Sequence, residues 1–331
     1  MKLIIQIPCL NEEGTLGVTL ADLPRQVPGF DEVEWLVIDD GSTDATSEVA
    51  RRCGVDHVVR HPVNLGLARA FTTGIEAGLR AGADVIVNTD ADNQYCAADI
   101  PKLVAPILDG RAQIVIGARP IETIDTFSPL KKLLQRVGSW IVRLASGADI
   151  PDAPSGFRAY HRDAAIKLYV LNSYTYTLET IIQAGRKGVR MTSVPIRVNG
   201  ETRPSRLVRG IFNYVSRSAA TILRISVLYA PVRFFTTLAL LAFVPGLMGI
   251  GRFLYYYVED GGAGHVQSLV ISAALIAAAV VLQIAGVLAD LIASNRTLLE
   301  DIRARQLRMD VEAIQRAPRT KPPSRQAEAA E

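Results

Sequence analysis

The chain has 331 residues, a formal net charge of +3 and three cysteines. This length can bury a full α/β domain of 200 or more residues and leave a substantial segment over. The small net charge argues against a nucleic-acid partner. Cys9, Cys53 and Cys96 lack CxxC spacing, which argues against a zinc site or a disulfide framework.

Apolar runs rich in β-branched residues alternate with helical patterns over the first 120 residues. Continuous apolar strands separated by helices indicate a mostly parallel sheet with helices on both faces. The opening run turns acidic and lacks a cleavage site, so it predicts a first strand and not a signal peptide. The predicted strands are 2–8, 34–40, 56–61, 84–90, 113–119 and 191–198, with helices at 44–53, 66–82 and 97–110.

Polar side chains follow the ends of these predicted strands. In parallel sheets ligands bind outside the carboxyl ends of the strands, so one site built from several strand ends is expected. The chain has neither GxGxxG after its first strand nor GxxxxGK[ST], which excludes dinucleotide-binding and P-loop classes. The residues concerned are Asn11, Glu12, Asp39, Asp40, Asp90, Asp92 and Arg119.

The sequence NTDADNQY places Asp90 and Asp92 two residues apart at the end of a predicted strand. Their hard oxygen atoms suit Mg²⁺ or Mn²⁺, which keep coordination positions open for substrate phosphates. Such an ion would assist a departing nucleotide as a Lewis acid. The alternative is a solvated turn before a helix, and Asp99 is assigned to that simpler role as a helix cap.

Two apolar segments, at about 234–258 and 266–291, are each long enough to cross a bilayer. The alternative is a buried hairpin of core helices. The connection between them carries no Lys or Arg, whereas both outer flanks are basic. The positive-inside rule therefore predicts a multi-pass protein of the inner or plasma membrane, with the N-terminal domain and both termini in the cytoplasm.

Segments 129–144 and 205–235 mix basic residues with apolar ones. Beside a membrane anchor they predict amphipathic helices resting on anionic headgroups, although a solvated helix face is the alternative. The polar tail after residue 317 is predicted to be disordered.

The motifs IPCLNEE, LVIDDGSTDAT, NLGLARAFTTGIEAG, NTDADNQY, IGAR and DAPSGFRAYHR occur in this order over residues 3–210. With them the chain resembles the inverting family 2 glycosyltransferases of GT-A fold. It is similar in particular to the polyprenyl-phosphate sugar synthases, the group of dolichyl-phosphate mannose synthase and undecaprenyl-phosphate glucosyltransferase. The organisation then expected is a catalytic domain at 1–204, interfacial helices at 205–232, a membrane hairpin at 233–293, and a charged helix with a disordered tail at 294–331.

The resemblance also implies roles for individual residues. The metal, Mg²⁺ or Mn²⁺, would bind Asp90, Asp92 and Gln94, and the acceptor lipid phosphate would meet Lys131, Arg136 and Ser139. The catalytic set would be Asp92, Arg119, Asp152 and Arg203. The nucleotide-sugar site would comprise Pro8, Leu10, Asn11, Glu12, Asp39, Asp90, Ala91, Arg119, Arg203, Ser205 and Arg206.

Two of these implied roles have alternatives. Arg119 could meet a phosphate or pair with a nearby carboxylate. Arg203, Ser205 and Arg206 depart from the G-x-S-K spacing common in the family, so a solvated basic loop is the alternative for them.

The function implied is transfer of a hexose from a nucleotide-diphosphate sugar, of the UDP-glucose or GDP-mannose class, to a polyprenyl phosphate. A phosphate monoester is mostly dianionic at neutral pH, so Asp152 is expected to orient the acceptor loop or pair with an arginine more than to act as a base. One alternative is a family 2 enzyme that adds sugar to a glycan hydroxyl, and another is a non-catalytic membrane-tethered scaffold. The resemblance further implies a homo-oligomer, with tetramers among its members.

Overall fold

The computed structural model describes residues 1–120, 143, 146, 147, 150–170, 176–199, 224, 227, 229–261 and 266–316. The chain divides into two compact units. Unit 1 comprises Met1–Arg206 with Ile302–Glu331, and unit 2 comprises Leu207–Asp301. The expected interfacial helices lie almost entirely outside the described residues, as does the tail after residue 317.

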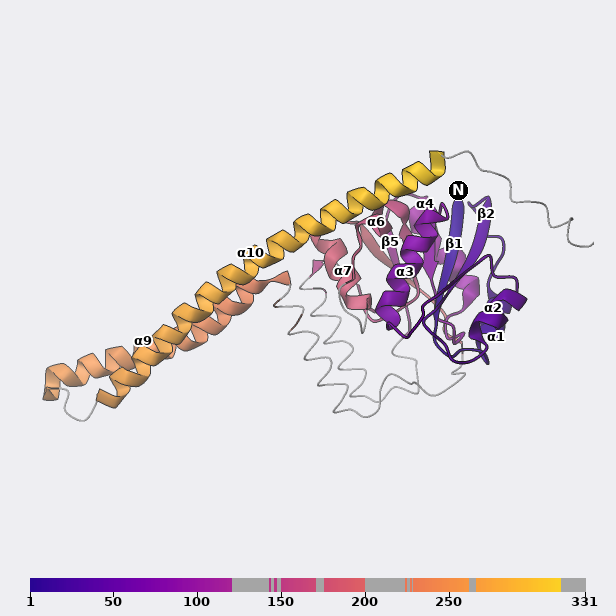
Figure 1. The fold of residues 1–331 in the computed structure, drawn as a ribbon. Helices are drawn as coiled ribbons and strands as arrows, with labels where there is room; N and C mark the ends of the chain where they lie inside the picture. The colour runs from indigo at the N-terminus through magenta and orange to yellow at the C-terminus, as the bar shows by residue number, and fades with distance from the viewer. Residues whose placement is uncertain are drawn as a thin grey trace, which may run out of the picture. The chain divides into compact units, whose positions relative to one another are not determined.

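Unit 1 contains a seven-stranded sheet with the order β3-β2-β1-β4-β6-β5-β7 (Figure 1). Strand β6 runs antiparallel to β4 and β5, and the other described pairings are parallel. The predicted mostly parallel sheet is confirmed. The sequence did not predict β6, because RAYH has no continuous apolar run. The strands are β1 (Lys2–Cys9), β2 (Glu32–Asp39), β3 (His57–Arg60), β4 (Val85–Asn88), β5 (Ile114–Ala118), β6 (Arg158–His161) and β7 (Met191–Pro195).

Successive side chains of a strand point to opposite faces of the sheet. Because the strands are apolar on both faces, helices cover both. Leu3, Ile5 and Ile7 of β1 join a core that also contains residues of α1, α2 and α4. The opposite face meets α3, where a Cβ added to Gly74 would lie 2.5 Å from Gln6 Oε1. Glycine at this position therefore allows α3 to lie close to the sheet.

The predicted helices at 44–53, 66–82 and 97–110 are confirmed. Helices α1, α6 and α7 were not predicted. Asp99 occupies the N-cap position of α4, but its carboxylate makes no cap hydrogen bond. It binds Arg197 and Lys102 instead. The helices are α1 (Leu16–Asp22), α2 (Thr46–Arg52), α3 (Leu67–Arg80), η1 (Ala97–Asp99), α4 (Ile100–Leu108), α6 (Arg162–Lys167) and α7 (Thr177–Arg186).

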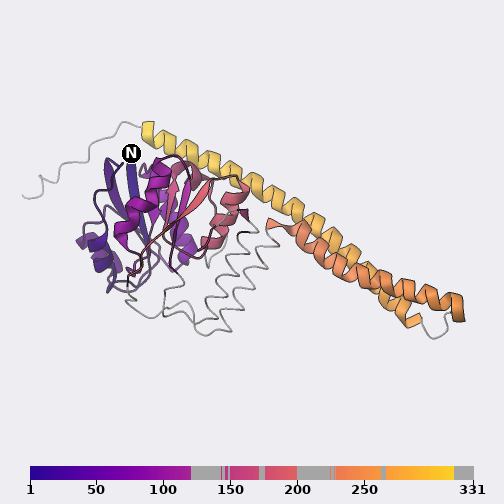
Figure 2. The ribbon, with the colours of Figure 1, turned by 180° about the vertical axis from the view of Figure 1, so that it is seen from behind.

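Unit 2 contains α9 (Pro231–Asp260) and most of α10 (Val266–Arg316), which run side by side (Figure 2). Both helices are long and apolar enough to cross a membrane. Large apolar side chains such as Leu241, Met248 and Ile292 are at least 67% exposed, which does not fit a hairpin of buried core helices. Gly249 allows close packing in this pair, since an added Cβ would lie 2.1 Å from Ser272 Oγ.

The last turns of α10, from Ile302 onward, belong to unit 1. Arg303 donates a hydrogen bond to Leu168 O at 3.1 Å, forms an ion pair with Glu76 at 2.5 Å, and lies over the Tyr169 ring. Leu307 and Val311 on the same segment are buried. This end of α10 is therefore packed into the unit that contains the sheet.

Candidate active site

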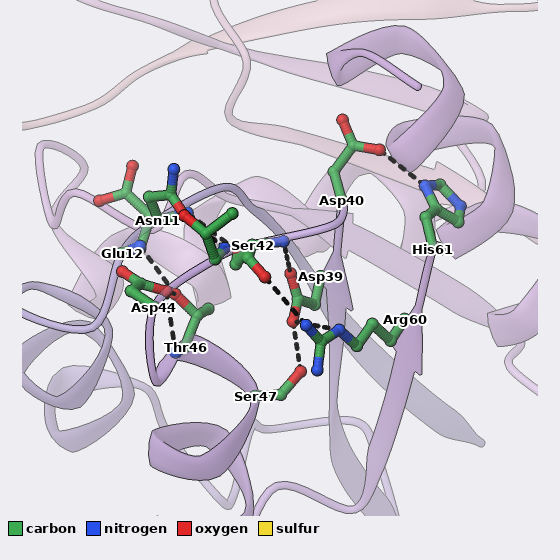
Figure 3. A network of polar contacts seen from close by, with 11 residues as sticks. Asn11, Glu12, Asp39, Asp40, Ser42, Asp44, Thr46, Ser47, Arg60 and His61 are labelled. Atoms are coloured by element: carbon green, nitrogen blue, oxygen red, sulfur yellow. Dashed lines mark hydrogen bonds and ion pairs between the residues drawn. The ribbon is translucent and has the colours of Figure 1, made fainter. Parts of the chain in front are cut away.

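Two loops after β1 and β2 are joined by backbone and side-chain hydrogen bonds (Figure 3). Asn11 has a φ of 54°, a left-handed conformation that asparagine tolerates better than most residues. Its Oδ1 accepts from Thr43 N at 2.8 Å, and its own N–H donates to Ser42 Oγ at 2.9 Å. Glu12 N donates to Thr46 Oγ1 at 2.8 Å. These contacts of Asn11 and Glu12 hold the loop after β1 against the loop after β2.

Asp39, the last residue of β2, has a fully buried carboxylate that fixes the following loop. It accepts from Ser42 N at 2.8 Å and from Ser47 Oγ, and Arg60 Nε lies 3.5 Å away (Figure 3). Burial raises the pKa of Asp39, but the hydrogen bonds from Ser42 and Ser47 outweigh that effect and leave it below its usual value. The carboxylate is thus held as an anion at the expected nucleotide side.

Asp40 anchors the start of α3. Its carboxylate lies 2.7 Å from His61 Nδ1 and accepts from Leu65 N at 2.9 Å and Gly66 N at 2.8 Å (Figure 3). A carboxylate at a helix N-terminus is favoured by the helix dipole. Asp40 therefore holds the loop between β3 and α3 in place.

Asp90 and Asp92 lie in the turn after β4, and both are half-buried. Burial raises the pKa of Asp90 most, Asp92 and Glu12 add to the rise, and Arg119 and Arg158 offset part of it, so that the pKa lies at about 7. No described residue donates a hydrogen bond to the Asp90 carboxylate. Gln94 N donates to Asp92 Oδ1 at 3.2 Å, which closes the turn.

This turn fits a hard divalent cation. Two half-buried carboxylates repel each other, and a cation between them would compensate that repulsion. Mg²⁺ and Mn²⁺ prefer such all-oxygen ligands. The described residues include no group of three or more His, Cys, Asp or Glu able to hold a metal. A hard cation held by two carboxylates keeps coordination positions open for other oxygen ligands, such as the phosphates of a substrate.

Arg119, directly after β5, forms a bidentate pair with Asp152. Its Nε lies 2.7 Å from Asp152 Oδ2 and its Nη2 3.0 Å from Oδ1, while the Arg119 N–H donates to Oδ2 at 3.1 Å. Asp152 is fully buried, and the Arg119 side chain is 17% exposed. Burial lowers the pKa of Arg119, but the hydrogen bond to Asp152 outweighs burial and raises it above its usual value. The alternative of a carboxylate partner for Arg119 matches this geometry.

Gly156 lies directly behind Asp90, where sequence reasoning placed nothing. A Cβ added to Gly156 would come within 3.2 Å of both Asp90 carboxylate oxygens. Its N–H donates to Tyr95 Oη at 3.0 Å, and its carbonyl accepts from Asn88 Nδ2 at 2.8 Å. Asn88 and Tyr95 thus hold the loop before β6 against the turn that contains Asp90 and Asp92. The motif SGFR at 155–158 was the only sequence signal of this arrangement.

The remaining expected residues fall into two groups. Pro8 is buried in β1, Leu10 follows it half-buried, and the buried Ala91 accepts a hydrogen bond from Thr19 Oγ1 at 2.8 Å through its carbonyl. The cationic loop and the acceptor-phosphate residues lie outside the described residues, so their roles stay predictions. These are Arg203, Ser205, Arg206, Lys131, Arg136 and Ser139.

The mixed α/β sheet with acidic loops at its strand ends defines a GT-A-like fold. Residues 4–169 match the model of glycosyl transferase family 2, and the chain belongs to that family. It is therefore a glycosyltransferase, as the sequence predicted.

Two curated relatives and one solved structure illustrate the likeness. An undecaprenyl-phosphate mannosyltransferase of Micrococcus luteus is 32% identical over 222 residues, which are 64% of this chain and 89% of the relative. A polyprenol monophosphomannose synthase of Mycolicibacterium smegmatis is 28% identical over 206 residues, which are 59% and 76% of the two chains. Glucosyl-3-phosphoglycerate synthase of Mycobacterium tuberculosis, solved with Mn²⁺ and UDP-glucose, gives a TM-score of 0.53 at 23% identity, covering 68% of this chain and 78% of that one.

Proposed function

We propose that this glycosyltransferase transfers a hexose from a nucleotide-diphosphate sugar to a polyprenyl phosphate with inversion at the anomeric carbon. Relatives named for undecaprenyl-phosphate and polyprenol-phosphate mannosyl transfer support this acceptor class. The two helices able to cross a membrane support an acceptor that resides in a membrane. The donor is of the UDP-glucose or GDP-mannose class.

The observation that carries the choice of acceptor is the pairing of Asp152 with Arg119. A general base needs an oxygen within hydrogen-bond reach of the acceptor hydroxyl. Asp152 is fully buried, and both of its oxygens accept from Arg119. This arrangement favours an acceptor that needs no deprotonation. A phosphate monoester meets that condition because it is mostly dianionic at neutral pH.

In the proposed reaction, a phosphate oxygen of the lipid attacks the anomeric carbon. The bond from that carbon to the nucleoside diphosphate breaks, and the leaving group departs with the electron pair. Asp90, Asp92 and Gln94 would hold Mg²⁺ or Mn²⁺, which supplies charge stabilisation to the leaving diphosphate. Asn11, Glu12 and Asp39 shape the nucleotide pocket together with Pro8, Leu10 and Ala91. Arg119 would supply positive charge beside the diphosphate, as would Arg203 and Arg206, and Ser205 would contribute a neutral hydroxyl.

Lys131, Arg136 and Ser139 would bind the lipid phosphate in the same scheme. The active form would be membrane-bound, with the catalytic unit in the cytoplasm and a homo-oligomeric assembly. Within unit 2, the small residues Gly249 and Ser272 pack α9 against α10.

The test compares acceptors. The full chain in detergent receives radiolabelled UDP-glucose or GDP-mannose, Mn²⁺, and either undecaprenyl phosphate or undecaprenol. We expect lipid-extractable label with the phosphate from one donor and none with the alcohol. No label on the lipid phosphate from either donor, in a protein that still binds nucleotide and Mn²⁺, would contradict the proposal and favour a different donor or the alternative activity on a glycan hydroxyl.

A further inference from the structure

Arg158, the first residue of β6, is a fully buried arginine that forms no salt bridge with a carboxylate among the described residues. Its guanidinium donates to four neutral oxygens at 2.6–2.9 Å, namely Ala153 O, Ser155 O, Thr177 O and Thr180 Oγ1. Burying a charge without an opposite charge is costly. The hydrogen bonds from Arg158 to these oxygens offset part of that cost.

The four acceptors of Arg158 come from two separate segments. Ala153 and Ser155 belong to the loop before β6, and Thr177 and Thr180 belong to the first turn of α7. A guanidinium presents its donors in a rigid planar fork, so it can hold both segments at once. A lysine would carry the charge but not this geometry.

The loop that Arg158 holds has a catalytic-site residue at each end. Asp152 at one end pairs with Arg119. Gly156 at the other end lies against Asp90, with 3.2 Å between an added Cβ and each carboxylate oxygen. A displacement of this loop would therefore move the surroundings of Asp90 and Asp152 together.

We infer that Arg158 is a positioning residue of the transfer site: its guanidinium fixes the 152–157 loop so that Asp90 can bind the metal and Asp152 can orient Arg119. The inference rests on the proposed function for the reaction itself. The metal affinity of the folded protein tests it without any donor sugar.

The experiment measures Mn²⁺ binding by electron paramagnetic resonance on the full chain in detergent, and sugar transfer on the same samples. For Arg158→Met we expect Mn²⁺ affinity at least tenfold weaker and kcat at least a hundredfold lower, because residues that orient metal ligands typically contribute 10–100-fold to affinity. For Arg158→Lys we expect partial recovery of both. The matched control is Arg162→Met, which removes an arginine paired with Asp84 at 3.5 Å just beyond β6, and stays within twofold of wild type.

The inference would be overturned if the Arg158→Met protein unfolds cooperatively, which shows that it is folded, and has the Mn²⁺ affinity and the kcat of wild type. If that variant does not fold, Thr180→Val decides, because it removes one acceptor and keeps the arginine. We expect three- to tenfold weaker Mn²⁺ binding for it, and an unchanged affinity would overturn the inference.

Two wild-type results separate this inference from the proposed function. A wild-type protein that binds Mn²⁺ but transfers no sugar would contradict the proposed function, while the variants would still decide the role of Arg158. A wild-type protein that binds no Mn²⁺ would overturn the inference.

Discussion

At the scale of single residues, the pairing with Arg119 favours a positioning role for Asp152 over the role of a general base. The two residues are 33 positions apart in the sequence, and the bidentate contact from Arg119 uses both oxygens of the fully buried Asp152 carboxylate. Residues that act as one unit give non-additive effects when both are replaced.

A double-mutant cycle tests whether these two residues act as a pair. We expect Asp152→Asn and Arg119→Gln each to lower kcat by about 10- to 100-fold, a loss typical of misplaced positioning groups. We expect the double variant to lose little more than the worse single variant. A general base would give a different result, with Asp152→Asn losing far more than Arg119→Gln.

Asp99 provides a pH-dependent contribution to stability. Burial raises its pKa, but Arg197 and Lys102 outweigh burial and lower it to about 2 from 3.8. A depressed folded-state pKa stabilises the protein above the unfolded value, and this contribution is lost as pH falls from about 5 to 2. The shift corresponds to roughly 2 kcal/mol.

We therefore expect the melting temperature of the Asp99→Asn variant to fall less between pH 7 and pH 3 than that of wild type. The control is Asp109→Asn, which alters an exposed pair with Arg111. Equal acid sensitivity of Asp99→Asn and wild type would show that the Asp99 contacts contribute no acid-labile stability.

Residues with a local sequence signal were predictable, and those defined by distant contacts were not. Asp90 and Asp92 follow an apolar strand in one short motif, so their position after β4 could be predicted. Arg158 has no such signal, because its role depends on carbonyl groups of a loop and of α7. Likewise, the environment of Asp99 depends on Arg197, 98 residues further on.

At the scale of elements, strands that contain adjacent β-branched apolar residues, such as β3 and β4, were predictable, and β6 was not. Strand β6 is four residues long and contains Arg158 and His161. It forms because it fills the gap between β4 and β5, with both neighbours supplying hydrogen bonds. Its pairing is a tertiary effect that local propensity does not encode.

The end of α10 is an element whose role becomes clear only in the fold. The sequence predicted a charged helix after the second span, and the structure packs residues from Ile302 into unit 1 through Arg303. We expect Arg303→Ala to destabilise unit 1 by about 1–2 kcal/mol, because it leaves Leu168 O and Glu76 without this donor.

The measurement is the melting temperature in detergent, which should fall by about 2–8 °C for a unit of this size. The control is Arg308→Ala, because Arg308 lies 3.6 Å from Asp163 in a pair that is 49% exposed on both sides. We expect it to change stability by less than about 0.5 kcal/mol. Equal effects of the two substitutions would contradict a specific role for Arg303.

At the scale of the whole molecule, the composition and the charge distribution of the sequence predicted more of the overall organisation than they did of the geometry of any single site. Two long apolar segments were evident from the sequence, and the structure contains the corresponding helices α9 and α10. The orientation in the membrane remains a prediction from the basic flanks.

Selective labelling from outside the cell tests that orientation. In a background that keeps one cysteine at a time, Glu259→Cys reports on the end of α9, and the exposed Cys53 reports on the catalytic unit. We expect a membrane-impermeant maleimide to label Glu259→Cys in intact cells and Cys53 only after permeabilisation. Labelling of Cys53 in intact cells would reverse the predicted topology.

The measurement that tests the central claim most directly is sugar transfer to undecaprenyl phosphate by wild type and by the Asp90→Ala, Asp92→Ala double variant. Asp109→Ala, on the exposed turn before β5, is the control. We predict Mn²⁺-dependent, lipid-extractable label for wild type and the control, and at least a 10³-fold loss for the double variant, the scale expected when transition-state charge stabilisation is removed. Undiminished transfer by the folded double variant would contradict the claim that these strand-end carboxylates carry the reaction.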